Sequence, residues 1–88
     1  MDTSSTLTPA SPCPLDAMRS SESGHIVALS GGRGLVSRLA ALGFLPGAPV
    51  DMVRNDGHGP IIVKVRQARV ALGRREATRI TVERETAP

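Results

Sequence analysis

Four side chains of this sequence belong to residue types that bind transition metals: His25, His58, Asp56 and Cys13. Two imidazoles and a carboxylate form a common site for a divalent transition metal. Asp56 and His58 lie in one short segment and could share a surface ion, but His25 is distant and neither His-x-x-x-His nor Cys-x-x-Cys occurs. The spacing therefore does not favour a built metal site. Cys13, the only cysteine, is interpreted as an inert free thiol.

Motifs for nucleotide binding and for nucleophilic catalysis are missing from the sequence. There is no Gly-x-x-x-x-Gly-Lys-Ser/Thr loop and no serine in a nucleophile-elbow pattern. A chain of 88 residues has room for one small domain, and such a domain leaves little space for a concave pocket. We therefore expect a protein that is not an enzyme.

Positive charge gathers in the second half of the chain, within a net charge of +3. Arg74 and Arg75 could pair with carboxylates or phosphates of a partner, because arginine pairs bidentately with both. The alternative is a solvated turn that Glu76 partly neutralises. Between positions 60 and 79 Glu76 is the only acidic residue, and the basic residues there are Lys64, Arg66, Arg69, Arg74, Arg75 and Arg79.

This basic segment leaves open an electrostatic nucleic-acid-binding function, which would depend steeply on salt. The aromatic content argues against that alternative. Phe44 is the only aromatic residue, so the chain lacks the faces on which single-stranded bases stack. It also lacks the aromatic walls of a groove for proline-rich peptides.

The two ends of the chain have the composition of unstructured segments. Residues 1–14 are rich in Ser, Thr and Pro and are predicted to be a disordered tail, and residues 83–88 a flexible C-terminus. The folded domain is predicted to span 15–82. The sequence has no run of about 18 apolar residues and no secretory signal at its start, so we expect a cytoplasmic protein.

Between these ends the hydrophobic pattern predicts short strands and one helix. A helix is expected over 35–42, because Leu35, Leu39 and Leu42 share one helical face, which would cover the opening of a barrel. Gly43 is expected to cap it and Phe44 to pack back on its last turn. Strands are expected at 25–29, 50–54, 61–66, 70–72 and 80–82, a helical turn at 74–77, and an amphipathic turn at 15–18 that plugs one end.

Five short antiparallel strands avoid exposed edges by closing into a barrel. The predicted fold is therefore mainly β, a small five-stranded barrel with a short helical insertion after the first strand.

The surface of the predicted helix is the first candidate for contact with a partner, through Val36 and Ala40 on its solvent side. Phe44 and Leu45 follow the helix and leave two alternatives open. Phe44 either folds back on Leu39 into the core, which we favour, or points outward and adds to an exposed apolar patch. The candidate partner-binding residues are Val36, Ala40, Phe44, Leu45, Arg74 and Arg75.

Three segments resemble the FeoA family in the correct order and spacing. Residues 38–47 read R-L-A-A-L-G-F-L-P-G, residues 59–65 read G-P-I-I-V-K-V, and residues 70–82 read V-A-L-G-R-R-E-A-T-R-I-T-V. The resemblance covers about residues 15–82 without a large gap. It implies an SH3-like barrel with a helical insertion.

The resemblance also implies a function. The chain would be a non-enzymatic accessory or regulatory protein of a membrane ferrous-iron transporter that carries a GTPase domain, located at the inner membrane only through that partner. An iron-binding chaperone or sensor is the remaining alternative, with Fe²⁺ held by His58, Asp56 or His25, although their spacing supports no cofactor. A weak homodimer through a barrel edge is compatible with this fold.

Overall fold

The computed structural model describes residues 12–85, and they form one antiparallel sheet with two short helices and a 3₁₀ turn. The strand order in the sheet is β1-β6-β2-β3-β4-β5. Residues 1–11 and 86–88, which hold most of the predicted N-terminal tail and half of the predicted C-terminal one, lie outside the described residues. The elements are β1 (Cys13–Pro14), η2 (Leu15–Ala17), β2 (Ser23–Leu29), α1 (Arg33–Ala41), β3 (Pro49–Arg54), β4 (Ile61–Val65), β5 (Ala68–Leu72), α2 (Arg74–Ala77) and β6 (Ile80–Arg84).

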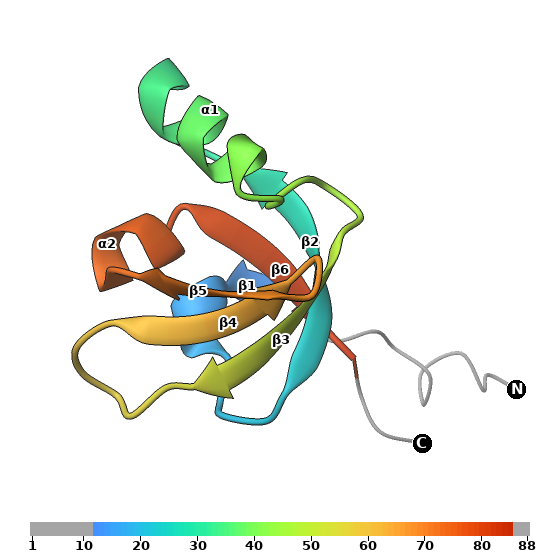
Figure 1. The fold of residues 1–88 in the computed structure, drawn as a ribbon, viewed down its shortest axis with the longest axis vertical. Coiled ribbons are helices and arrows are strands. Elements are labelled where there is room, and N and C mark those ends of the chain that lie inside the picture. The colour runs from blue at the N-terminus through green and yellow to red at the C-terminus, as the bar shows by residue number, and fades with distance from the viewer. Residues whose placement is uncertain (1–11, 86–88) are drawn as a thin grey trace, which may run out of the picture.

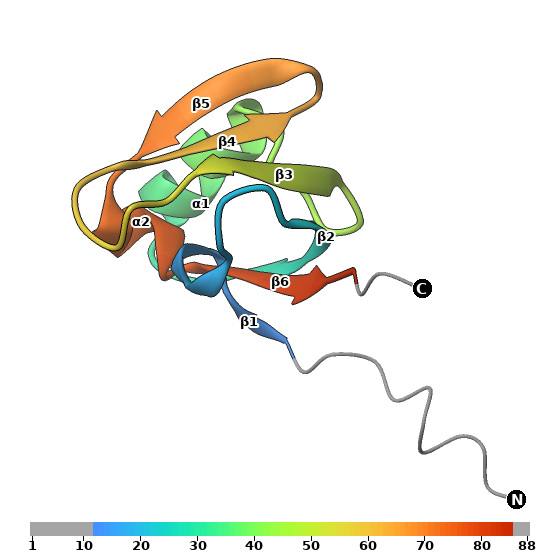
Figure 2. The same cartoon turned by 90° about the horizontal axis from the view of Figure 1, so that it is seen from below.

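The sheet curls around a single core, as Figure 1 and Figure 2 show from two directions. This arrangement confirms the mainly β, SH3-like fold, and the helix follows the first long strand as expected. A sixth strand was not predicted. Cys13 and Pro14, assigned to the tail, pair with Val82 and Thr81 and form β1, because extended backbone at the sheet edge finds hydrogen-bond partners there. Within residues 12–85 the two end strands, β1 and β5, do not pair with each other, so the sheet is not a closed barrel.

Alternation along the strands builds the core. In β4 the side chains of Ile61, Val63 and Val65 are buried, while Lys64 between them is exposed. Leu15 and Met18 are fully buried at one end, which confirms the expected apolar plug. Burying each such large aliphatic side chain contributes about 1.5–3 kcal/mol. The remaining core residues are Ile26, Leu39, Phe44, Val50, Met52, Leu72, Ala77, Ile80 and Val82.

Helix α1 ends in the glycine cap that the sequence predicts. Gly43 has a φ of +105°, and its N–H donates to the carbonyl of Ala40 at 2.9 Å. The N–H of Phe44 donates to the carbonyl of Leu39 at 3.0 Å, which completes the pair of bonds of a Schellman cap. The chain then turns sharply at Pro46 and Gly47, where the N–H of Ala48 donates to the carbonyl of Leu45 at 2.9 Å.

One part of the helix prediction was wrong. Leu39 is buried and Leu35 is half-buried, but Leu42 is 43% exposed rather than facing the core. The helix ends at Ala41, so Leu42 stands at its C-cap, where the backbone already turns toward Gly43 and carries the side chain away from the Leu35–Leu39 stripe. No helix within residues 12–85 is long and apolar enough to cross a membrane.

Candidate functional site

Three large apolar side chains are exposed in the described residues: Leu42 (43%) and Leu45 (45%) at the C-terminal end of α1, and Val27 (40%) in β2. The loop after α1 is held against β2 beside Val27, because the N–H of Gly47 donates to the carbonyl of Ile26 at 2.6 Å. The register of β2 with β6 shifts between Ile26 and Ala28, so Val27 sits at an irregularity of the strand. We call Val27, Leu42 and Leu45 the α1-end surface.

Helix α1 projects from one end of the sheet (Figure 1), and this position exposes much of its side. Leu35 and Leu39 attach it to the core, and its Arg38 guanidinium forms an ion pair with the carboxylate of Glu76 in α2. Val36 and Ala40, predicted to face a partner, are half-buried. Both therefore present only part of their surface to solvent, at the flank of the α1-end surface.

Phe44 is not on the surface. Its side chain is 0% exposed and belongs to the core, which corrects its place among the candidate partner-binding residues and confirms the favoured alternative. The physical reason is the Schellman cap, since the residue after the cap glycine commonly packs back on the last helical turn. Leu45, the next residue, points outward and keeps its place as a candidate contact.

Arg74 is engaged inside the molecule. It is half-buried, and its Nη2 donates a hydrogen bond to Oδ1 of Asn55, while its Nε is buried without a partner within the described residues. This arrangement makes Arg74 a support of the fold more than a free contact. Arg75 is exposed, and its carbonyl accepts a hydrogen bond from the hydroxyl of Thr78 at 2.7 Å.

Asn55 is a residue whose role the sequence analysis missed. Its side-chain amide donates to the carbonyls of Asp16 and Met18, at 2.9 and 2.6 Å. Its Oδ1 also accepts from the N–H of Gly57 at 3.1 Å, a local turn that asparagine often makes. The Asn-Asp-Gly pattern could have indicated that turn, but nothing in the sequence indicates the long-range bonds.

The three metal candidates do not come together. His25 pairs in register with Pro49 at the start of β3, and its Nε2 lies 3.2 Å from Oε1 of Glu83. Asp56 and His58 lie beyond the other end of β3, and the carboxylate of Asp56 pairs with Nε of Arg54 at 2.9 Å. Nowhere in the described part of the chain do three His, Cys, Asp or Glu side chains approach closely enough to hold a metal ion.

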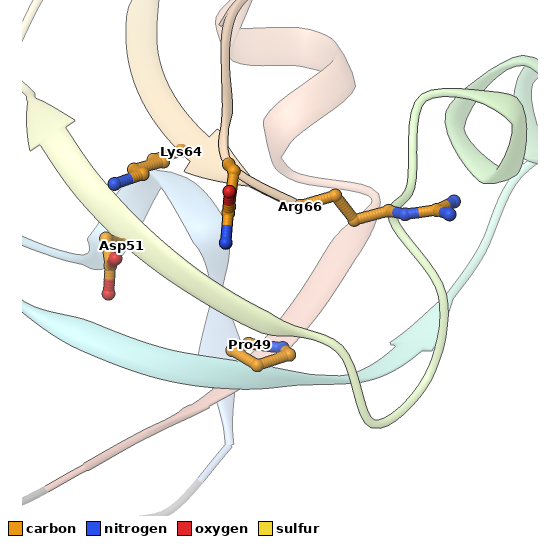
Figure 3. Close-up of a pocket in the computed structure, with 5 residues that line it drawn as sticks. Pro49, Asp51, Lys64 and Arg66 are labelled. Carbon is orange, nitrogen blue, oxygen red and sulfur yellow. The ribbon is translucent and has the colours of Figure 1, made fainter.

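A shallow pocket of about 360 Å³ lies on the outer face of β3 and β4, lined by Pro49, Asp51, Lys64, Arg66 and Gln67. Figure 3 shows Arg66 extending from the β4–β5 hairpin toward the segment around α1. The Asp51 carboxylate accepts a hydrogen bond from the Ser23 hydroxyl at 2.7 Å. Four of its five lining residues are polar or charged, and two of these, Lys64 and Arg66, are cationic.

Comparison with known proteins places the chain among small domains of ferrous-iron transport. The sequence model of the FeoA domain matches residues 13–84, from the start of β1 to the end of β6. A crystal structure of an iron-uptake regulatory protein, FeoA, is 31% identical with a TM-score of 0.81, over 85% of this chain and all of that one. No curated protein sequence matches.

Two further solved structures resemble the chain. FeoA of Stenotrophomonas maltophilia, crystallised with zinc and described as an SH3-domain protein and a candidate activating factor of ferrous-iron transport, is 30% identical with a TM-score of 0.70, over 78% of this chain and 87% of that one. A manganese-dependent transcriptional repressor is 25% identical with a TM-score of 0.77, but this chain, 89% of which is matched, spans only 44% of that protein.

Proposed function

Because the chain belongs to the FeoA family, we propose that it is a cytoplasmic, non-enzymatic subunit that binds the membrane transporter for ferrous iron and regulates or assembles it through the transporter's GTPase domain. Members of the family are small accessory domains associated with ferrous-iron transport.

The observation that carries the proposal is the α1-end surface. Three large apolar side chains stay exposed on a domain that buries its other large aliphatic residues fully or in part. Single exposed apolar side chains are ordinary, but Leu42 and Leu45 lie together at one helix end, and the loop that follows them contacts the strand that carries Val27; this arrangement favours a protein contact. Leu42 and Leu45 lie two residues before and one residue after Phe44. Because Phe44 is buried in the core, it anchors the short segment that carries both leucines.

The structure also supports a binding role over catalysis. The pocket on β3 and β4 is open and shallow. Its side chains Asp51 and Lys64 are exposed and lie opposite each other on neighbouring strands, an arrangement typical of a solvated sheet face. A binding domain needs only a rigid display of side chains, and the single core supplies that rigidity.

The proposal is tested by co-purification of the full chain with the ferrous-iron transporter of the same organism, with and without GTP. We expect retention by the wild-type protein and loss of retention for the double variant Leu42→Glu/Leu45→Glu. His58→Glu is the matched control, because it adds a carboxylate at an exposed loop beyond the opposite end of β3 from Leu45. Wild-type protein that is not retained in either nucleotide state would rule the proposal out, and retention of the double variant would move the contact away from α1.

A further inference from the structure

Strand β5 is one of the two end strands of the sheet, and among residues 12–85 no strand pairs with its outer edge. It pairs only with β4 among the described strands, and the register runs from Val65 opposite Ala68 to Ile61 opposite Leu72 without a bulge. Figure 2 shows β5 at the rim of the sheet, with no ribbon beyond it. An edge of this kind can accept a further strand, because its outer backbone groups have no partner.

The hairpin geometry identifies these groups. Arg66 and Gln67 form a two-residue turn, with φ of +52° and +64°, which is the type I′ conformation. Such a turn makes Val65 and Ala68 a hydrogen-bonded pair, and hydrogen-bonded and non-hydrogen-bonded pairs then alternate along the ladder. The N–H and C=O groups of Arg69 and Ala71 therefore point away from β4. No turn or loop hydrogen bond among residues 12–85 uses them.

Three charged side chains form a row across β3, β4 and β5, and the row ends at the edge with a positive charge that has no negative neighbour beyond it among the described residues. Asp51 in β3 lies opposite Lys64 in β4, and Lys64 lies opposite Arg69 in β5, all three exposed. Lys64 and Arg69 form a non-hydrogen-bonded pair, whose Cα atoms lie about 4.5 Å apart and whose side chains approach closely. Like charges directly opposite one another are unfavourable. In the strand register Lys64 lies opposite Asp51 as well, whereas no acidic residue of the described strands lies opposite Arg69. Neither cation forms an ion pair within 4.0 Å in the described residues.

We propose that the edge of β5 binds an extended, acidic segment of a partner protein by strand addition, with a carboxylate placed opposite Arg69. The backbone of that segment would pair with Arg69 and Ala71, and its acidic side chain would continue the row Asp51–Lys64–Arg69 with the missing negative charge. This surface involves other residues than the α1-end surface, so the inference stands independently of the proposed transporter contact.

Other occupants fit this edge less well. A second copy of the chain pairing β5 with β5 would place two Lys64–Arg69 pairs on one sheet without supplying a carboxylate beside either Arg69, which costs association free energy. Nucleic acid would bring phosphate acceptors to an edge that presents the C=O groups of Arg69 and Ala71 as well as their N–H groups. Residues 1–11 of this chain carry one acidic residue, Asp2, and would compete weakly.

The test is an NMR titration of the ¹⁵N-labelled full chain at low salt with a seven-residue peptide that alternates glutamate and valine. We expect the amides of Arg69 and Ala71 to shift and their hydrogen exchange to slow about tenfold or more, because they gain hydrogen bonds. The amides of Ala68 and Val70 already bond to β4 and should change little. A peptide with lysine in place of glutamate should not bind.

Arg69→Glu should weaken the acidic peptide about tenfold, since it turns an attractive cross-strand pair into a repulsive one. It relieves the contact with Lys64, so the fold should persist. Arg33→Glu is the matched control, because it makes the same charge change at an exposed site at the start of α1 and should leave the dissociation constant unchanged.

Several outcomes would overturn the proposal. One is equal binding of a peptide methylated at the backbone nitrogens that face β5, because charge alone would then explain the contact. Another is continued fast exchange of Arg69 and Ala71 at saturation. Protection of these amides from exchange in the free protein would show that the edge is already occupied. Protection that fades on dilution would identify a second copy as the occupant, and protection that persists would identify the chain's own N-terminal segment.

Discussion

The side chain of Arg66 lies over Gly43, which joins the β4–β5 hairpin to the end of α1. A Cβ atom at position 43 would stand 2.5 Å from Cδ of Arg66 and 3.1 Å from its Cγ. Gly43 thus meets two requirements at once: a φ of +105° for the helix cap, and room for the aliphatic stem of Arg66 from the β4–β5 turn. The exposed Leu42 and the buried Phe44 flank this contact.

Gly43→Ala should therefore destabilise the protein by about 1–3 kcal/mol, because alanine is strained at this φ and its methyl group overlaps Arg66. Urea unfolding of wild type and variant measures the difference. In an Arg66→Ala background the same substitution should cost less, since only the backbone strain remains. Gly34→Ala in α1 is the control: no atom lies within 4 Å of its added Cβ, and we expect stabilisation of about 0.5 kcal/mol. Equal costs at both glycines would contradict this account.

Asn55→Ala should destabilise the domain by about 2–4 kcal/mol, since it leaves the carbonyls of Asp16 and Met18 and the half-buried Arg74 guanidinium without their partner. Thermal and urea unfolding give the size of the effect. His58→Ala in the same loop should change stability by less than about 0.5 kcal/mol, because His58 is exposed. If both variants unfold alike, Asn55 does not tie η2 and α2 to the end of β3.

Glu76 should matter more to stability than its ion-pair partner Arg38. Its carboxylate pairs with Arg38, but Oε1 also accepts from the N–H of Gly73 at 3.2 Å at the start of α2. A double-mutant cycle should give a coupling of about 0.5 kcal/mol that fades in high salt, because the Arg38 side chain is 61% exposed and that of Glu76 is 32% exposed, so solvent ions reach the pair. Glu76→Ala should cost about 1 kcal/mol more than Arg38→Ala, through the lost helix-end bond. A coupling free energy that does not change with salt would contradict the assignment of the Arg38–Glu76 coupling to a screened ion pair.

Phe44 and Leu45 should give opposite results although they are neighbours. Phe44→Ala should destabilise the protein by about 3–5 kcal/mol, because it empties a fully buried site. Leu45→Glu should leave stability within about 0.5 kcal/mol and act only on partner binding. Chemical denaturation of both variants, followed by retention on the transporter for the stable one, separates the two roles. A large loss of stability in Leu45→Glu would remove it from the candidate contacts.

Much of the fold follows from short-range sequence patterns. The alternation in 61–65 fixed which residues of β4 face the core, and the helical turn at 74–77 is found where it was expected. The Gly43 cap and the Pro46–Gly47 turn were also predicted, because each depends on the φ preference of one or two residues. The family resemblance added the SH3-like arrangement, which the fold confirms.

The tertiary structure decided what depends on residues far apart in the chain. Cys13 joins the sheet only because Val82 is there to pair with it, and Asn55 acquires its role from carbonyls 39 and 37 residues earlier in the chain. The unbalanced charge of Arg69 exists because strand register places Lys64 opposite it. Local patterns specify backbone conformation within a few residues, whereas pairing, burial and the identity of the free edge are properties of the packed whole.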